Sequence, residues 1–280
     1  MMKRPPRPPI APGDAHFRSD FQLLEAPPET TPHRRDALSS GTGSSIAAIP
    51  GGALTIDEDN GQLTLLNDEL EVVDRVEIAS GAGLLAVDRE RKRVFVADRM
   101  NDRVQLLSYG EKLSKVGSFA TEQEPYNVAL SPKGDTLYVL SVAGRKVQAL
   151  DARTGDEAFH IDIGPEARGL SVSPDGHELA VSFLNTSALA KVDISGDAPR
   201  LRFQAITDGR TPSERNNTNV SRFEAIPERH ARAAFATTYI GDTAVVAYQQ
   251  SSPLSATKVR EVRGTYGGSA EGNPPLMQRL

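Results

Sequence analysis

The chain has 280 residues, of which 38% are apolar and 25% are charged, and its formal net charge is −5. It contains no cysteine, which excludes disulfides, thiolate zinc sites, cysteine nucleophiles and haem attachment through Cys-x-x-Cys-His within this sequence. The acidic balance gives no overall basic field for nucleic acid. No stretch approaches the roughly 18 apolar residues that a membrane-spanning helix requires. We therefore expect a protein with a buried core, no nucleic-acid partner and no transmembrane segment.

Residues 1–43 are rich in proline, which removes backbone donors and favours extended conformations. This composition predicts a disordered, solvated arm. Its Pro-x-x-Pro spacing also suits an SH3-like or WW-like partner. The first ten residues are basic, but no apolar segment follows them, so the sequence as it begins shows no secretion signal.

A sequence block recurs about every 42 residues after the arm. The clearest copies are Ser131-Pro-Lys-Gly-Asp-Thr-Leu-Tyr-Val139 and Ser173-Pro-Asp-Gly-His-Glu-Leu-Ala-Val181, and a third begins at Asp88. A period of this length with strand-like content is typical of one four-stranded propeller blade per repeat. The sequence therefore predicts an all-β fold in which residues 44–280 form a β-propeller of about five recognisable blades.

The predicted blades follow one another along the chain. Each has an apolar first strand near the axis and more polar third and fourth strands, with Asn-Gly, Lys-Gly or Asp-Gly turns between strands. Four regular blades are predicted near 44–80, 81–123, 124–164 and 165–206. Their strands are expected at 45–49, 53–56, 62–66, 71–78, 84–87, 93–97, 103–108, 113–119, 127–130, 136–141, 146–151, 157–163, 169–173, 178–183, 188–193 and 200–206.

The pattern breaks at 207–230, which is polar and is predicted to be an insertion. Strands resume at 233–237, 243–249 and 258–262, giving an irregular fifth blade near 231–265. Ring closure protects the edge strands of a propeller. Three arrangements stay open: a closed five-blade ring, closure with another chain, or the first part of a longer protein with a missing C-terminal module. The lack of a clean fourth strand in blade five favours the last.

The repeats resemble known propeller families. Residues 127–139 and 169–181 resemble the bacterial YVTN-type repeat, and Leu85-Ala-Val-Asp88 with 94–98 and 101–105 resembles an NHL-type repeat. The resemblance covers about 44–205 and implies a bacterial propeller. Proteins of the YVTN type are commonly exported; some are fused to a cytochrome c or di-haem peroxidase-like module, and others resemble lactonases. This sequence lacks both a signal peptide and Cys-x-x-Cys-His, so the resemblance suggests export while the compartment stays open.

Candidate ligand-binding residues lie where first strands begin. The repeat places Gly83, Tyr126 and Arg168 at equivalent positions, and Asn127 follows Tyr126. Arginine offers a charged fork and tyrosine a stacking face, so this rim could hold an anionic or polar ligand. The alternative is that these groups solvate the channel mouth or bridge neighbouring blades. The rim candidates are Tyr126, Asn127, Arg168 and His230.

A long insertion on a rigid scaffold is a second place for function. Its candidates are Arg215, Asn216, Asn217 and Asn219, and the alternative is a solvated surface loop. Asparagine oxygens can bind a hard divalent cation, but no calcium-loop spacing is present. We predict no metal site and no cofactor in this chain.

No arrangement of histidine, serine and acidic residues indicates catalysis. We therefore predict a non-catalytic propeller that binds a protein or a small polar ligand at the propeller face, and whether it is an enzyme stays open. One alternative is a lactonase-like hydrolase, which would need His230, Arg168 and a glutamate to converge at the rim. The other is the propeller part of a cytochrome c or peroxidase-like redox protein, with its haem module beyond residue 280.

Overall fold

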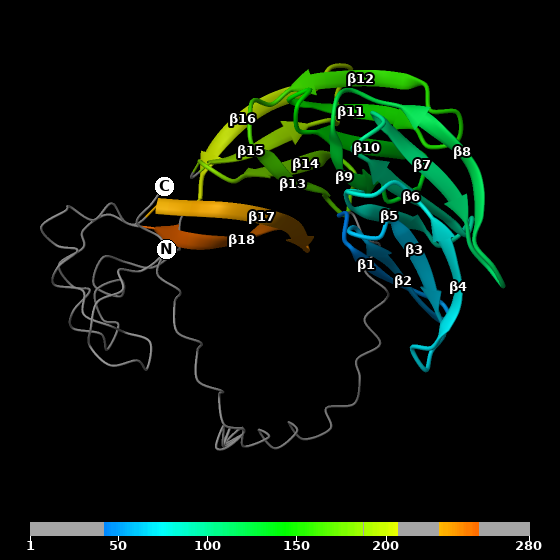
Figure 1. Ribbon diagram of the computed structural model, residues 1–280. Helices are drawn as coiled ribbons and strands as arrows, with labels where there is room; N and C mark the ends of the chain where they lie inside the picture. The colour runs from blue at the N-terminus through cyan, green and yellow to red at the C-terminus, as the bar shows by residue number, and fades with distance from the viewer. Residues whose placement is uncertain (1–41, 187, 207–229, 252–280) are drawn as a thin grey trace, which may run out of the picture. The chain divides into compact units, whose positions relative to one another are not determined.

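The computed structural model describes residues 42–186, 188–206 and 230–251. These residues form 18 β-strands and no helix (Figure 1). Sixteen strands make four antiparallel sheets of four strands each, and the last two make a hairpin. Each sheet is one predicted repeat, so the all-β fold of four-stranded blades is confirmed. The described residues include no helix long and apolar enough to cross a membrane.

The strands follow the chain order within each sheet. The first sheet comprises β1 (Ile46–Ile49), β2 (Gly52–Asp57), β3 (Gln62–Leu66) and β4 (Val72–Glu77), and the second comprises β5 (Leu85–Asp88), β6 (Arg93–Asp98), β7 (Arg103–Ser108) and β8 (Ser114–Ala120). The third comprises β9 (Pro125–Leu130), β10 (Thr136–Ser141), β11 (Lys146–Asp151) and β12 (Glu157–Asp162), and the fourth comprises β13 (Ala167–Val172), β14 (Glu178–Phe183), β15 (Ala188–Asp193) and β16 (Arg200–Ala205). The hairpin comprises β17 (His230–Ile240) and β18 (Thr243–Ser251).

The first strands β5, β9, β13 and β17 contact one another in chain order, and β1 contacts β5. Second strands such as β6, β10 and β14 are buried along nearly their whole length, because neighbouring sheets cover both of their faces. Fourth strands such as β4 and β12 keep mostly exposed or half-buried residues. The exposed fourth strands agree with the sequence prediction. The third strands β3, β7, β11 and β15 were also predicted to be polar, and this was wrong, because most of their residues are buried.

The repeated Ser-Pro-x-Gly block forms the turn between the first and second strands. The Ser173 hydroxyl accepts hydrogen bonds from the backbone N–H groups of His177 and Glu178, at 3.1 and 2.9 Å. Ser131 does the same in the third blade, and the carboxylate of Asp88 takes this place in the second. The block therefore recurs because each copy satisfies the backbone donors of a tight turn.

Apolar side chains fill the junctions between successive sheets. The first and second sheets share a cluster that includes Leu54 and Val96, the second and third share one that includes Phe95 and Leu137, and the third and fourth share one that includes Leu179. These residues are fully buried. Burial of a leucine or phenylalanine contributes roughly 1.5–3 kcal/mol, so these three clusters hold the blades together.

The segment Thr42–Ser44 lies across the first strands of several blades. The Thr42 hydroxyl lies 2.8 Å from the carbonyl of Leu170 on β13 and 2.9 Å from that of Thr237 on β17. Ser44 exchanges two backbone hydrogen bonds with Leu85 on β5. The segment therefore links blades that are far apart in sequence, and we call it the strap.

Asp98 is a buried carboxylate at the end of β6. Its side chain is 0% exposed and accepts hydrogen bonds from Arg103 at 2.8 Å, Asn101 at 2.8 Å and Gln105 at 2.9 Å. Burial alone would raise the pKa of Asp98, but the three donors outweigh it and hold the pKa below its ordinary value. The charged form therefore stabilises the folded state.

We expect Asp98→Asn to lower the free energy of unfolding at neutral pH by about 1–3 kcal/mol, because the charge-assisted hydrogen bonds to Asp98 are lost. The effect is limited because solvent around the partly exposed Arg103 already screens the ion pair. A depressed folded-state pKa gives stability that is present above about pH 4 and is lost as the pH falls through the folded-state value. The difference between wild type and Asp98→Asn should therefore shrink at acid pH. Urea denaturation at several pH values measures it, and a difference independent of pH would contradict the assignment.

Candidate functional site

Two arginines and one tyrosine meet where the first strands begin. Tyr126 is the second residue of β9, and Arg168 is the second residue of β13. The Arg168 Cζ lies 5.3 Å from the centroid of the Tyr126 ring, and the Arg99 Cζ lies 5.5 Å from it. Both distances fall within the range of a cation–π interaction. Three blades thus contribute to one group, which we call the rim cluster: Arg99, Tyr126 and Arg168.

The two arginines of the rim cluster differ in their partners. Arg99 forms a salt bridge with Glu124. Arg168 donates to the carbonyl of its neighbour Ala167 at 3.0 Å, and its nearest carboxylate, Glu166, lies 3.8 Å away, beyond hydrogen-bond distance. The Arg168 side chain is 18% exposed, so part of its guanidinium faces solvent. Among the described residues, Arg168 therefore keeps donors that an incoming acceptor could use.

Asn127 links two blades. Its side chain is buried, with 2% of its surface exposed, and Nδ2 donates to the carbonyl of Arg168 at 2.9 Å. The bond ties β9 to β13 and fixes the backbone that carries Arg168 next to Tyr126. Asn127 thus has the blade-bridging role that was one of the two sequence interpretations, while Tyr126 and Arg168 come together as the repeat suggested.

The other site residues predicted from the sequence lie wholly or partly outside the described residues. His230 begins β17 and pairs in register with Ser251, but its side chain lies outside the described part of the chain. The insertion candidates Arg215, Asn216, Asn217 and Asn219 also lie outside it. Within the described ranges, no three His, Asp or Glu side chains are grouped as a metal site would need. The convergence of His230, Arg168 and a glutamate, which the lactonase-like alternative requires, involves a side chain outside the described residues.

Arg99 and Glu124 were not among the site residues predicted from the sequence. Arg99 follows β6, in the turn that leads to β7, and it reaches the next blade rather than its own first strand. Glu124 directly precedes β9. The available signal was topological, because the end of a second strand lies at the same side of an antiparallel sheet as the start of a first strand.

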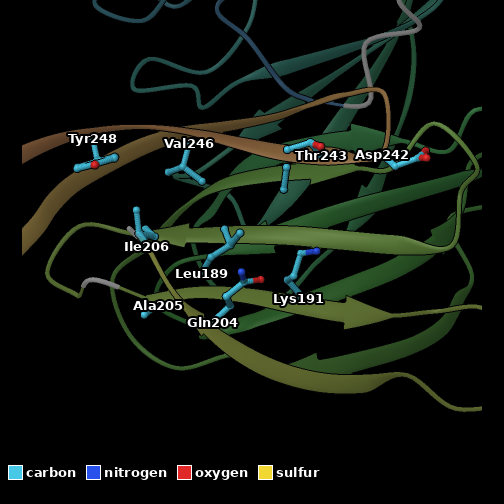
Figure 2. Close-up of a pocket in the computed structure, with 10 residues that line it drawn as sticks. Leu189, Lys191, Gln204, Ala205, Ile206, Asp242, Thr243, Val246 and Tyr248 are labelled. Atoms are coloured by element: carbon cyan, nitrogen blue, oxygen red, sulfur yellow. The ribbon is translucent and has the colours of Figure 1, made fainter. Parts of the chain in front are cut away.

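A separate cleft of about 310 Å³ lies between the fourth sheet and the hairpin. In Figure 2, residues of β18 and its turn lie along one side, and residues of β15, β16 and the position after β16 lie along the other. The lining residues are Leu189, Lys191, Gln204, Ala205, Ile206, Asp242, Thr243, Ala244, Val246 and Tyr248.

A polar cluster closes one end of this junction. Glu178 is paired with Lys191 at 2.6 Å and with Arg202, and it accepts a hydrogen bond from the Tyr239 hydroxyl at 2.8 Å. Burial would raise the pKa of Glu178, but its donors and cations hold it below the ordinary value. Burial and the bond to Glu178 raise the pKa of Tyr239, so the phenol stays protonated. This cluster fastens the hairpin to blade four.

Comparison with known proteins supports the fold. No family model matches the chain, and no curated protein matches its sequence. A functionally unknown protein from Desulfotomaculum acetoxidans is 16% identical with a TM-score of 0.50, over 58% of this chain and 55% of its own. A chain of the mitotic checkpoint complex is 11% identical with a TM-score of 0.56, over 73% of this chain and 60% of its own.

A third solved structure is a Bacteroides uniformis protein provisionally assigned as a 6-phosphogluconolactonase. It is 14% identical, with a TM-score of 0.49 over 74% of this chain and 70% of its own. The chain spans between half and two thirds of the length of the first two structures. At these identities the likeness shows the fold alone. The four-stranded sheets, together with the first two structures, define a β-propeller fold.

Proposed function

We propose that this is a non-catalytic propeller of YVTN- and NHL-like repeats, and that it binds a polar ligand with an acidic group at the rim cluster. The ligand can be a small molecule or an acidic side chain of a partner protein. The observation that carries the proposal is the placement of two guanidinium groups, from different blades, around the ring of Tyr126.

The chemistry of the rim cluster suits a carboxylate. Arg168 has unused donors in a planar fork, which is the geometry that pairs with a carboxylate through two hydrogen bonds. The ring of Tyr126 holds the guanidinium of Arg168 from one side, so the Arg168 side chain loses little conformational entropy when a ligand binds. Asn127 holds the strand beneath it. Tyr126 and Arg168 thus lie on strands, and only Arg99 lies in a turn.

Citrate is a suitable probe because it carries several carboxylates. The chain has six tyrosines and no tryptophan, so a change at Tyr126 is visible in tyrosine fluorescence. We expect saturable binding of citrate to the full chain, measured by calorimetry and fluorescence. Arg168→Gln should weaken it about tenfold or more, because a charge-assisted hydrogen bond contributes about 1.5–3 kcal/mol.

Arg153→Gln is the matched control, because Arg153 is exposed in the turn between β11 and β12. It should bind citrate like the wild type, and both variants should melt like the wild type. Absence of citrate binding, or equal affinity in Arg168→Gln and wild type, would contradict the proposal.

A further inference from the structure

Among the described residues, the junction between the fourth sheet and the hairpin contains fewer buried apolar side chains than the other junctions. Its cluster holds three buried apolar residues, Ala180, Leu189 and Tyr239, whereas each of the other three clusters holds at least twelve. Ala244 and Val246 pack against it only partly buried. Well-packed interiors leave few spaces larger than a water molecule. The cleft in Figure 2 lies at this junction, and Leu189, Ala244 and Val246 belong both to the cluster and to the lining of the cleft.

The hairpin also leaves one strand edge without a partner in the described part of the chain. The second strands β2, β6, β10 and β14 pair with neighbours on both edges, whereas β18 pairs with β17 alone. An edge strand presents a row of backbone donors and acceptors, and an extended peptide can add to it as a further strand. Because β18 also lines the cleft, side chains of an added strand could enter it.

The cleft is apolar at one end and acidic at the other. Figure 2 shows Leu189, Ile206 and Val246 toward one end of the cleft, which we call the apolar end, although Tyr248 also lines it there. An adjoining cleft of about 320 Å³ shares Lys191 and Asp242 with it, and is also lined by Asp175, His177, Glu178, Asp193 and Arg202.

The charges at the acidic end do not balance. Lys191 and Arg202 are both paired with Glu178. Within the described ranges, Asp175, Asp193 and Asp242 form no salt bridge with lysine or arginine. This end therefore carries an excess of negative charge, which is complementary to a basic group.

We propose that the β18 edge and this cleft bind an extended segment of a partner protein in which apolar and basic residues alternate. The segment adds to β18 as a strand. Its apolar side chains enter the space beside Leu189 and Val246, and a lysine or arginine reaches Asp242 and Asp193. The backbone provides affinity, and the alternation provides specificity. This site is separate from the rim cluster and does not depend on the function proposed there.

The probe is a fluorescein-labelled peptide of three valine–lysine pairs, titrated with the full chain and followed by fluorescence polarisation. A peptide of three valine–glutamate pairs is the matched control. We expect saturable binding of the lysine peptide and at least tenfold weaker binding of the glutamate peptide. Added salt should weaken the binding, because part of the recognition is electrostatic.

Two variants test the two ends of the cleft. Ala244 lines the cleft beside Leu189, so Ala244→Leu should narrow it and weaken binding of the lysine peptide at least fivefold while keeping or raising the melting temperature. Asp242→Asn removes an acidic group at an exposed turn and should weaken binding of the lysine peptide about threefold. Asp59→Asn, in the exposed turn between β2 and β3, should have no effect. Equal binding of the two peptides, or unchanged affinity in both cleft variants, would overturn the proposal. Absence of binding to the full chain would overturn it too.

Discussion

Replacement of Leu179 by aspartate is expected to abolish cooperative folding. Leu179 is 0% exposed in the cluster between the third and fourth sheets, and its backbone pairs with Val172 and Val192. Loss of a buried leucine costs roughly 2–5 kcal/mol, and a buried carboxylate without a cation adds several more. The sum approaches the whole stability of a typical domain, about 5–15 kcal/mol. Circular dichroism during heating should show no cooperative transition.

The matched control for Leu179→Asp is Val116→Asp. Val116 lies on the outer strand β8 and is 59% exposed, so a charge there stays solvated. We expect its free energy of unfolding to change by about 0.5 kcal/mol or less. A cooperative melt of Leu179→Asp within a few degrees of the wild type would show that the blades do not pack through this cluster.

Replacement of Gly43 by valine is expected to displace the strap. A Cβ atom at Gly43 would lie 2.3 Å from Oδ1 of Asn127 and 2.6 Å from the carbonyl oxygen of Val128, so either the strap or β9 must move. Overpacking of this kind costs typically about 1–3 kcal/mol. The hydrogen bonds of Thr42 and Ser44 are at risk as well. We expect a melting temperature lower by several degrees.

Gly117→Val is the matched control for Gly43→Val. Gly117 lies on β8, and a Cβ atom there meets no other atom within 4 Å. A β-branched residue suits an exposed strand, so this variant should melt at or slightly above the wild-type temperature. A Gly43→Val protein as stable as the wild type would show that the strap does not hold the first strands together.

Much of the blade architecture was predictable because each repeat carries its own turn and its own buried second strand. The ranges 136–141 and 178–183 were predicted and correspond to β10 and β14. The strap was not predictable, because residues 42 and 43 fall within the segment assigned to the proline-rich arm. Threonine and glycine there show no periodic pattern, and their contacts are with strands more than 40 residues away.

The candidate site was predictable only in part. The repeat phase brought Tyr126 and Arg168 to equivalent positions, and the structure brings them together. The repeat phase could not show that the side chain of Asn127 hydrogen-bonds to β13, because side-chain direction depends on the packing of neighbouring blades. It missed Arg99 because blade-to-blade contacts join residues at different phases of the repeat. The cleft depends on incomplete packing of one junction, which no local pattern encodes.

Hydrogen–deuterium exchange of the full chain with and without citrate tests directly whether the rim cluster binds an acidic ligand. Bound citrate should slow exchange in peptides around Tyr126 and Arg168 and leave exchange around β3 and β12 unchanged. This protection should disappear in Arg168→Gln. Protection confined to other blades, or no protection at saturating citrate, would contradict a ligand site at the rim cluster.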